Sequence, residues 1–201
     1  DQITFLKGAQ AVVLYGSKAA KGAVLITTKR GKNDGLKVEV RANTGLHVAK
    51  SFPEYLSSAE YMTLYNEARA NDGLTPLYSA ADIYNHGSGL NPYRYPNIDY
   101  YSSDYIRKMY SRHEATAEIS GGGERAHFYS NINYYRSGDY FKFGEAKNNH
   151  ISRFSVRGNV DVNISEDIKA WVNSSATFYD SNTAKGNYWN VAATMRPNFP
   201  Q

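Results

Sequence analysis

Residues 36–48 have the sequence LKVEVRANTGLHV, in which apolar and polar side chains alternate. Successive side chains of a β-strand point to opposite faces of its sheet, so this stretch has one apolar and one polar face. The apolar face comprises Val38, Val40, Ala42, Thr44, Leu46 and Val48, and the polar face comprises Lys37, Glu39, Arg41, Asn43 and His47. The pattern predicts a two-faced strand.

The same alternation returns four times, over residues 112–121, 125–136, 151–164 and 167–180. These segments have roughly ten to fourteen residues, whereas strands of soluble proteins have about five or six. A tilted strand needs about 9–11 residues to cross a bilayer. The length therefore favours membrane strands, although a soluble β-sandwich would show the same alternation.

The connections between the five strands alternate in length, which also favours the membrane. They cover residues 49–111, 121–124, 138–149, 165–166 and the chain from 181 onward, so that they are long, short, medium, short and long. Barrels of the outer membrane have short periplasmic turns and longer external loops. We therefore expect the first strand to run outward and the preceding segment to join it from the periplasmic side.

The composition argues against several classes of function. The 201 residues include 23 basic and 19 acidic side chains, with a net charge of +4 and no block of like charge that would indicate a nucleic-acid-binding tail. Cysteine is absent and the five histidines lack metal-ligand spacing, so we predict no metal site, no cofactor and no enzyme. There is no stretch of about 18 apolar residues, so no transmembrane helix is predicted.

The first long link, residues 49–111, is predicted to contain helices. Ser57 and Glu60 have the spacing of a capping box, which begins a helix. Two further short helices are expected over residues 79–84 and 102–109. A long loop with helices of its own usually has a function.

Six aromatic residues in the long links are candidate substrate-binding residues. Aromatic rings offer flat apolar platforms with a polar tip, which suits the C–H faces of sugar rings. The alternative is that they pack the loops against a barrel rim or a lid protein. The candidates are Tyr93, Tyr95, Tyr100 and Tyr101 in the first long link, and Tyr188 and Trp189 in the last.

Residues 1–35 follow a different pattern. A short strand is expected at residues 3–6 and a helix at 9–15. A buried strand is expected over 22–28, where the run AVLITT is apolar and β-branched. Residues 29–35 form a polar, glycine-containing link.

The segments LKGAQA at 6–11 and LYGSKAAKGAVLITTK at 14–29 resemble the closing part of the plug of TonB-dependent receptors, especially the SusC/RagA branch. Further motifs are similar to elements of that branch and occur in the same order. They are PNIDY at 96–100, ISGG at 119–122, YSNINYYRSG at 129–138 and MRPNFP at 195–200.

The resemblance implies an antiparallel membrane β-barrel of about 22 strands with an α/β plug domain inside it. Residues 1–35 would be the C-terminal part of the plug, and residues 36–201 about five first strands with extracellular loops. The implied function is TonB-dependent import of oligosaccharides or peptides across the bacterial outer membrane. A SusD-like surface lipoprotein would act as lid, and TonB would bind a segment outside this chain. Alternatives are a siderophore or vitamin receptor, or a soluble tyrosine-rich glycan-binding β-domain.

The resemblance also assigns roles to side chains. The plug-motif residues are Tyr15, Gly16, Ser17, Gly22, Thr28 and Lys29. The turn that Gly16 and Gly22 bracket would lie near the substrate or the translocation path, unless it serves fold geometry alone. Polar strand residues would face the lumen and hold the plug, or contact substrate: Arg41, His47, Glu114, Glu118, Asn131, Tyr135, Arg153 and Arg157. Apolar strand residues would face lipid: Val38, Val40, Leu46, Phe154, Val156, Val160, Val162 and Phe178.

Overall fold

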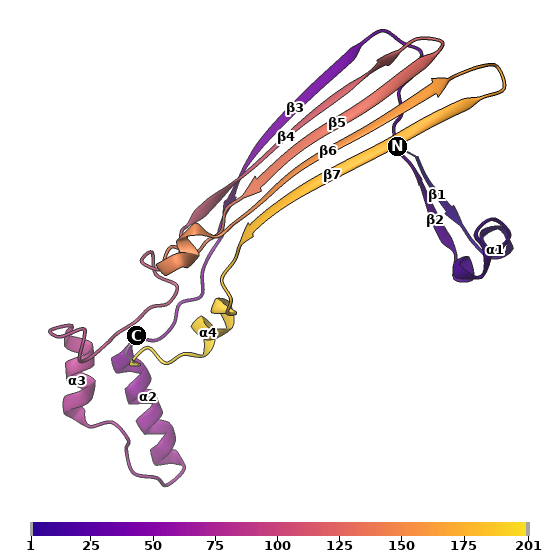
Figure 1. The fold of residues 1–201 in the computed structure, drawn as a ribbon. Coiled ribbons are helices and arrows are strands. Elements are labelled where there is room, and N and C mark those ends of the chain that lie inside the picture. The colour runs from indigo at the N-terminus through magenta and orange to yellow at the C-terminus, as the bar shows by residue number, and fades with distance from the viewer. Residues whose placement is uncertain (1, 200–201) are drawn as a thin grey trace. The chain divides into compact units, whose positions relative to one another are not determined.

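The computed structural model describes residues 2–199 and contains two sheets (Figure 1). One has two strands, β1 and β2, and the other has five strands in the order β3-β4-β5-β6-β7. Asp1, the first residue of the predicted plug segment, lies outside the described residues. So do Pro200 and Gln201, at the end of the predicted barrel segment, and Pro200 is also the last residue of the motif at 195–200. The division into plug and barrel segments at residue 35 stays a prediction.

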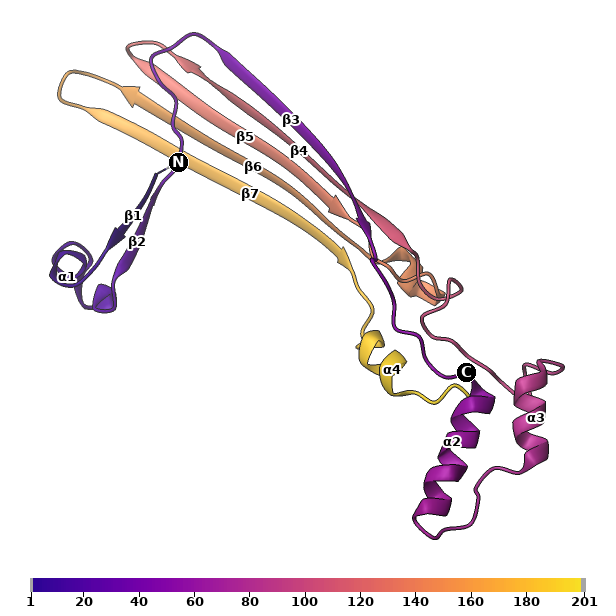
Figure 2. The same cartoon turned by 180° about the vertical axis from the view of Figure 1, so that it is seen from behind.

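The five predicted two-faced strands are confirmed. They are β3 (Lys37–Val48), β4 (Met109–Gly122), β5 (Ala126–Ser137), β6 (His150–Asn163) and β7 (Lys169–Asn182). Each strand is hydrogen-bonded to the next one in the chain. The view from behind shows the five strands in this order (Figure 2). The strands have 12 or 14 residues, well beyond the usual length in soluble proteins.

The chain forms two compact units, and each of the five long strands contributes residues to both. The first unit covers the described residues up to Ala42, together with Ala115–Tyr134 and Arg153–Phe178. The second covers Asn43–Glu114, Tyr135–Ser152 and the described residues from Tyr179 onward.

In the first unit, β1 (Gln2–Leu6) pairs antiparallel with β2 (Ala23–Thr27). The helix α1 (Ala9–Tyr15) and a 3-10 helix (Gly16–Ala19) connect them, so the predicted strand–helix–strand order is confirmed. The prediction that the second strand is buried is wrong, because Val24 is 57% and Ile26 is 59% exposed. Two strands alone cannot enclose apolar side chains, and nothing else within residues 2–199 buries them.

The same hairpin explains two motif glycines by backbone geometry. Gly16 has φ 71° and Gly22 has φ 105°, values that residues with a side chain rarely adopt. A Cβ on Gly22 would also lie 3.1 Å from the carbonyl oxygen of Leu6. Both glycines are therefore required by the turn itself.

In the second unit, the predicted capping box begins α2 (Ser58–Asn71). The Ser57 N–H donates to Glu60 Oε2 at 2.9 Å, and the Glu60 N–H donates to Ser57 Oγ at 3.4 Å. The second predicted helix is α3 (Ala80–Ser88), which is longer than expected and has its own capping box from Ser79.

The predicted third helix over residues 102–109 is wrong. The N–H groups of Tyr105 and Ile106 both donate to the carbonyl oxygen of Ser102, which makes a turn rather than a helix. Ile106 is 2% exposed and forms a β-bridge with Phe141, so tertiary packing overrides the local pattern. Two short helices of the second unit were not predicted: a 3-10 helix (Gly144–Asn148) and α4 (Tyr188–Thr194).

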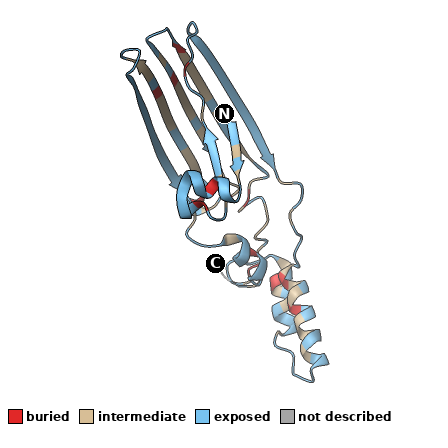
Figure 3. Ribbon diagram, turned by 90° about the vertical axis from the view of Figure 1, so that its right-hand side faces the viewer, coloured by how far each residue is buried: buried red, intermediate tan, exposed pale blue. Residues whose placement is uncertain are grey.

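The burial of the sheet in the first unit is inverted relative to a soluble protein. On the predicted lipid-facing side of the inner strands, Phe154 is 40% and Val160 is 42% exposed. On the predicted lumen-facing side, Asn159 is 2% and Tyr129 is 8% exposed. The edge strands β3 and β7 are exposed throughout, whereas the inner strands are partly covered (Figure 3). The chain thus covers the polar face of the inner strands and leaves the edge strands uncovered.

Within residues 2–199, no helix has the length and apolar character needed to cross a membrane.

Candidate functional site

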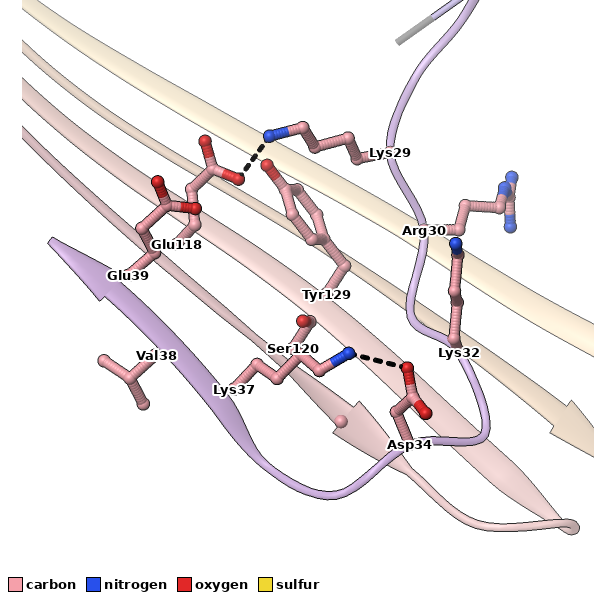
Figure 4. Close-up of a pocket in the computed structure, with 11 residues that line it drawn as sticks. Lys29, Arg30, Lys32, Asp34, Lys37, Val38, Glu39, Glu118, Ser120 and Tyr129 are labelled. Carbon is pink, nitrogen blue, oxygen red and sulfur yellow. Dashed lines mark hydrogen bonds and ion pairs between the residues drawn. The ribbon is translucent and has the colours of Figure 1, made fainter. Parts of the chain in front are cut away.

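The segment that follows β2 lies along the polar face of the inner strands, within the first unit. Thr28 Oγ1 accepts a hydrogen bond from Arg157 Nη2. The carbonyl oxygen of Lys29 accepts from Asn159 Nδ2 at 3.1 Å, and Lys29 Nζ lies 2.7 Å from Glu118 Oε2. Figure 4 shows the side chains of Lys29 and Glu118 pointing toward one another. We call residues 28–34 the anchor segment.

Arginine side chains add further ion pairs to the anchor segment. Arg30 pairs with Asp161 of β6, and its Nη2 donates to Asn173 Oδ1 of β7 at 3.3 Å. Arg41 Nη2 lies 3.6 Å from Glu118 Oε1, so Glu118 is placed between two cations. The hydrogen bond to Glu118 raises the pKa of Lys29, so this residue stays charged at neutral pH.

Gly31 brings the anchor segment into contact with the backbone of β5. This residue is buried, and a Cβ added to it would overlap the main chain of Phe128. This role carries no signal in the sequence, because a glycine in a polar link is more simply interpreted as a break between elements. Arg30 was likewise not among the predicted site residues.

Beside the anchor segment lies an open pocket of about 630 Å³. Its lining mixes charges of both signs, and one pair within it, Lys37 Nζ and Asp34 Oδ2, is 2.8 Å apart. The hydrogen bond from Lys37 holds the pKa of Asp34 below its usual value. Residues 2–199 contain no cluster of His, Asp or Glu suited to a metal ion. The arrangement is suited to holding charged and polar groups.

The structure separates the six predicted plug-motif residues into two groups. Thr28 and Lys29 belong to the anchor segment and contact the predicted lumen-facing residues Arg157 and Glu118. The others lie in the hairpin between β1 and β2 and its turn. These are Tyr15, Gly16, Ser17 and Gly22.

In the second unit, aromatic side chains from distant loops form a cluster. Tyr101 and Trp189 have ring centroids 5.9 Å apart, and Phe141 and Tyr188 are 5.1 Å apart. Tyr188 Oη donates to the carbonyl oxygen of Tyr100 at 2.7 Å. The aromatic cluster comprises Phe52, Tyr55, Tyr100, Tyr101, Tyr105, Tyr140, Phe141, Phe143, Tyr188 and Trp189.

The aromatic cluster contains four of the six predicted substrate-binding residues, namely Tyr100, Tyr101, Tyr188 and Trp189. The other two lie apart from it. Tyr95 packs edge-on against His86, with ring centroids 5.4 Å apart, and Tyr93 is 95% exposed. Tyr93 is therefore free to meet a ligand, whereas the four cluster residues also hold the loops together.

Tyr188→Phe is expected to destabilise the loops by about 1 kcal/mol at neutral pH, because the carbonyl of Tyr100 loses its donor. Burial raises the pKa of Tyr188 to about 12, from about 10 in an exposed tyrosine. The raised pKa means that this contribution is complete below about pH 10 and is lost as the pH rises toward 12. Unfolding of the full-length protein, followed at several pH values, should show the two proteins converging above pH 10. A constant difference would contradict the assignment.

No family model matches the sequence. Relatives do match: the chain is 30% identical to TonB-dependent receptor P26 of Formosa agariphila over 196 residues, which is 96% of this chain and 18% of the receptor. TonB-dependent receptor P3 of the same organism is 28% identical over 84% of this chain and 14% of its own length. TonB-dependent receptor SusC of Bacteroides thetaiotaomicron is 39% identical over 33% of this chain and 7% of its own length.

The fold also matches a solved structure, that of the RagAB peptide transporter. The TM-score is 0.65, with 18% identity over 91% of this chain and 22% of that chain. At this identity the likeness concerns the fold, and it confirms the predicted antiparallel barrel strands with part of a plug. The chain spans 18% or less of the length of the curated relatives named above.

Proposed function

The chain corresponds in sequence and fold to part of the TonB-dependent receptors of the SusC/RagA type, and from this we propose that its protein imports nutrients across the bacterial outer membrane. The observation that carries the proposal is the inverted burial of the five-stranded sheet. Along the inner strands, apolar side chains such as Phe154 and Val160 are exposed, as lipid contact requires, whereas the polar face is covered by the anchor segment.

The anchor segment is suited to joining a plug to a barrel wall. Its ion pairs are partly exposed: the side chains of Lys29 and Arg30 are 41% and 42% accessible. Exposed ion pairs contribute little individually, in the range of about 0–1 kcal/mol. Several of them together can hold a segment in register, yet allow neighbouring parts of a plug to rearrange during transport.

The proposed cargo is an oligosaccharide or a peptide. Exposed tyrosines in the long loop support this, since Tyr93 presents a flat ring with a polar tip to the solvent. The similar fold of RagAB, a peptide transporter, supports a peptide as one of the two cargo classes. The proposed partners are TonB and a SusD-like lipoprotein.

A gene deletion in the source bacterium tests the proposal. The deletion strain should lose growth on oligosaccharides or on peptides as the sole nutrient of that class, and should keep growth on the corresponding monomers. Restoring the gene should restore growth only in cells with functional TonB. Tagged full-length protein should also co-purify with a SusD-like lipoprotein.

Two results would contradict this function. One is normal growth of the deletion strain on all oligosaccharides and peptides, combined with loss of growth when iron or a vitamin is limiting. This would favour the siderophore or vitamin receptor. The other is recovery of the full-length protein in the aqueous fraction without detergent, which would favour the soluble glycan-binding domain.

A further inference from the structure

A second pocket, in the second unit, has a basic lining. Its volume is about 600 Å³, and it lies where the loop between β5 and β6 meets the beginning of β4. Among the described residues that line it, none carries a carboxylate. We call it the basic pocket, and its cationic or titratable lining residues are Arg107, His113, Arg136, Lys147 and His150.

The strand residues of the basic pocket belong to the apolar face of the sheet. The N–H of Gly138 donates to the carbonyl oxygen of Ser111 at 3.0 Å. In an antiparallel pair this register sets Arg136 of β5 opposite His113 of β4. Side chains alternate along a strand, so Arg136 shares the face of Tyr134, two residues away. His150 likewise shares the face of Phe154 in β6.

The loop that forms the rest of the pocket is held in place by internal hydrogen bonds. Arg107 Nη1 donates to the carbonyl oxygen of Phe141 at 2.7 Å, and its Nη2 donates to that of Lys147 at 3.0 Å. Asn149 Nδ2 donates to Asp139 Oδ2 at 2.9 Å. Arg107 therefore fixes the backbone that carries Lys147.

Two cations of the basic pocket are available to bind a ligand. His150 Nε2 lies 3.0 Å from Asp180 Oδ2, and His113 Nδ1 lies 3.3 Å from Thr44 Oγ1, so both histidines are engaged. Within residues 2–199, neither Arg136 nor Lys147 forms an ion pair, and both are exposed. Arg107 donates to carbonyl oxygens of the loop, so Arg136 and Lys147 are the cations of this pocket whose donors can bind a ligand.

We propose that the basic pocket binds the phosphate of a lipid head group in the outer leaflet. The proposal rests on the membrane location in the proposed function. A guanidinium and an ammonium group, the latter on a loop held by internal hydrogen bonds, are suited to phosphate oxygens. The basic pocket lies on the apolar face of the sheet, at the loop end of the strands. In a membrane strand, this is the level at which the lipid-facing surface meets the head-group layer.

The test uses purified full-length protein in detergent, with lipid A carrying both phosphates and the same lipid after both phosphates are removed. Wild type should bind the phosphorylated lipid more tightly than the dephosphorylated one. The double variant Arg136→Gln/Lys147→Gln should bind the phosphorylated lipid at least about tenfold more weakly, since the charge-assisted hydrogen bonds of both side chains to the phosphate are lost. Its affinity for the dephosphorylated lipid should not change.

Arg112→Gln is the matched control. Arg112 lies beside His113 but on the other face of β4, where its Nη2 is 3.4 Å from Glu114 Oε2. Its loss should leave lipid binding unchanged. If the double variant folds poorly, the single variant Lys147→Gln replaces it in the test, because Lys147 is an exposed loop residue. It should also bind the phosphorylated lipid more weakly than wild type.

Equal binding of phosphorylated lipid A by wild type and the double variant would overturn the proposal. So would tight binding of inorganic phosphate alone that the double variant loses, because the pocket would then take the free ion. Cargo uptake by the double variant should stay near wild type. If the wild-type protein binds phosphorylated lipid A but imports no cargo, the proposed function is contradicted. The proposal that the basic pocket binds lipid phosphate would still stand.

Discussion

Replacing Gly31 with leucine is expected to prevent the anchor segment from docking on the sheet. Gly31 is buried, and any side chain would overlap the main chain of Phe128, which belongs to a strand and cannot move aside as a flexible side chain could. Overpacking typically costs about 1–3 kcal/mol, and we expect a loss of about 3 kcal/mol here. Thermal unfolding of the purified full-length protein in detergent measures the loss.

The control for this variant is Gly35→Leu, four residues further along. A Cβ on Gly35 would meet no atom within 4 Å, and its φ is not in the left-handed region. The same added volume should therefore lower stability by less than about 1 kcal/mol. If both variants unfold at the wild-type temperature, the contact between the anchor segment and β5 does not exist in the protein.

Val156→Arg is expected to block membrane insertion. Val156 lies on the apolar face, near the middle of β6, where an arginine facing lipid costs about 2–4 kcal/mol. The amount of folded protein at the cell surface should fall severalfold or more. Surface labelling of intact cells, with total protein measured in the same cells, gives this quantity.

Ser155→Arg is the paired variant, because the neighbouring side chain points to the polar face. This face already carries Arg153 and Arg157, so a further arginine stays in a polar environment. Its surface yield should remain close to wild type. Equal yields of the two variants would contradict the assignment of the faces.

The strands could be predicted from sequence because each has one alternating pattern along its whole length. An alternation of period two needs no knowledge of partners, and it placed β3 to β7 within a few residues. The wrong predictions came from longer-range effects. The turn after Ser102 depends on the bridge between Ile106 and Phe141, and the exposure of β2 depends on what surrounds the hairpin.

The sequence predicted which residues contribute to the candidate site, but it did not predict which of them contact one another. Alternation placed Glu118 and Arg157 on the polar face, and the motif resemblance singled out Thr28 and Lys29. The pairings join residues 89 and 129 positions apart, so no local pattern could reveal them. Gly31 has no chemical signature at all, since its role is to have no side chain.

The most direct test of the membrane assignment is to measure which reagents reach successive residues of β7. Single cysteines at positions 172–177 of the full-length protein, in a cysteine-free background, can be spin-labelled and tested for collision with oxygen and with a water-soluble nickel complex. We predict that oxygen reaches positions 172, 174 and 176 best, because these side chains face lipid, and that nickel reaches 173, 175 and 177 best. Shielding of 172, 174 and 176 from both reagents, as in the core of a soluble sandwich, would contradict it.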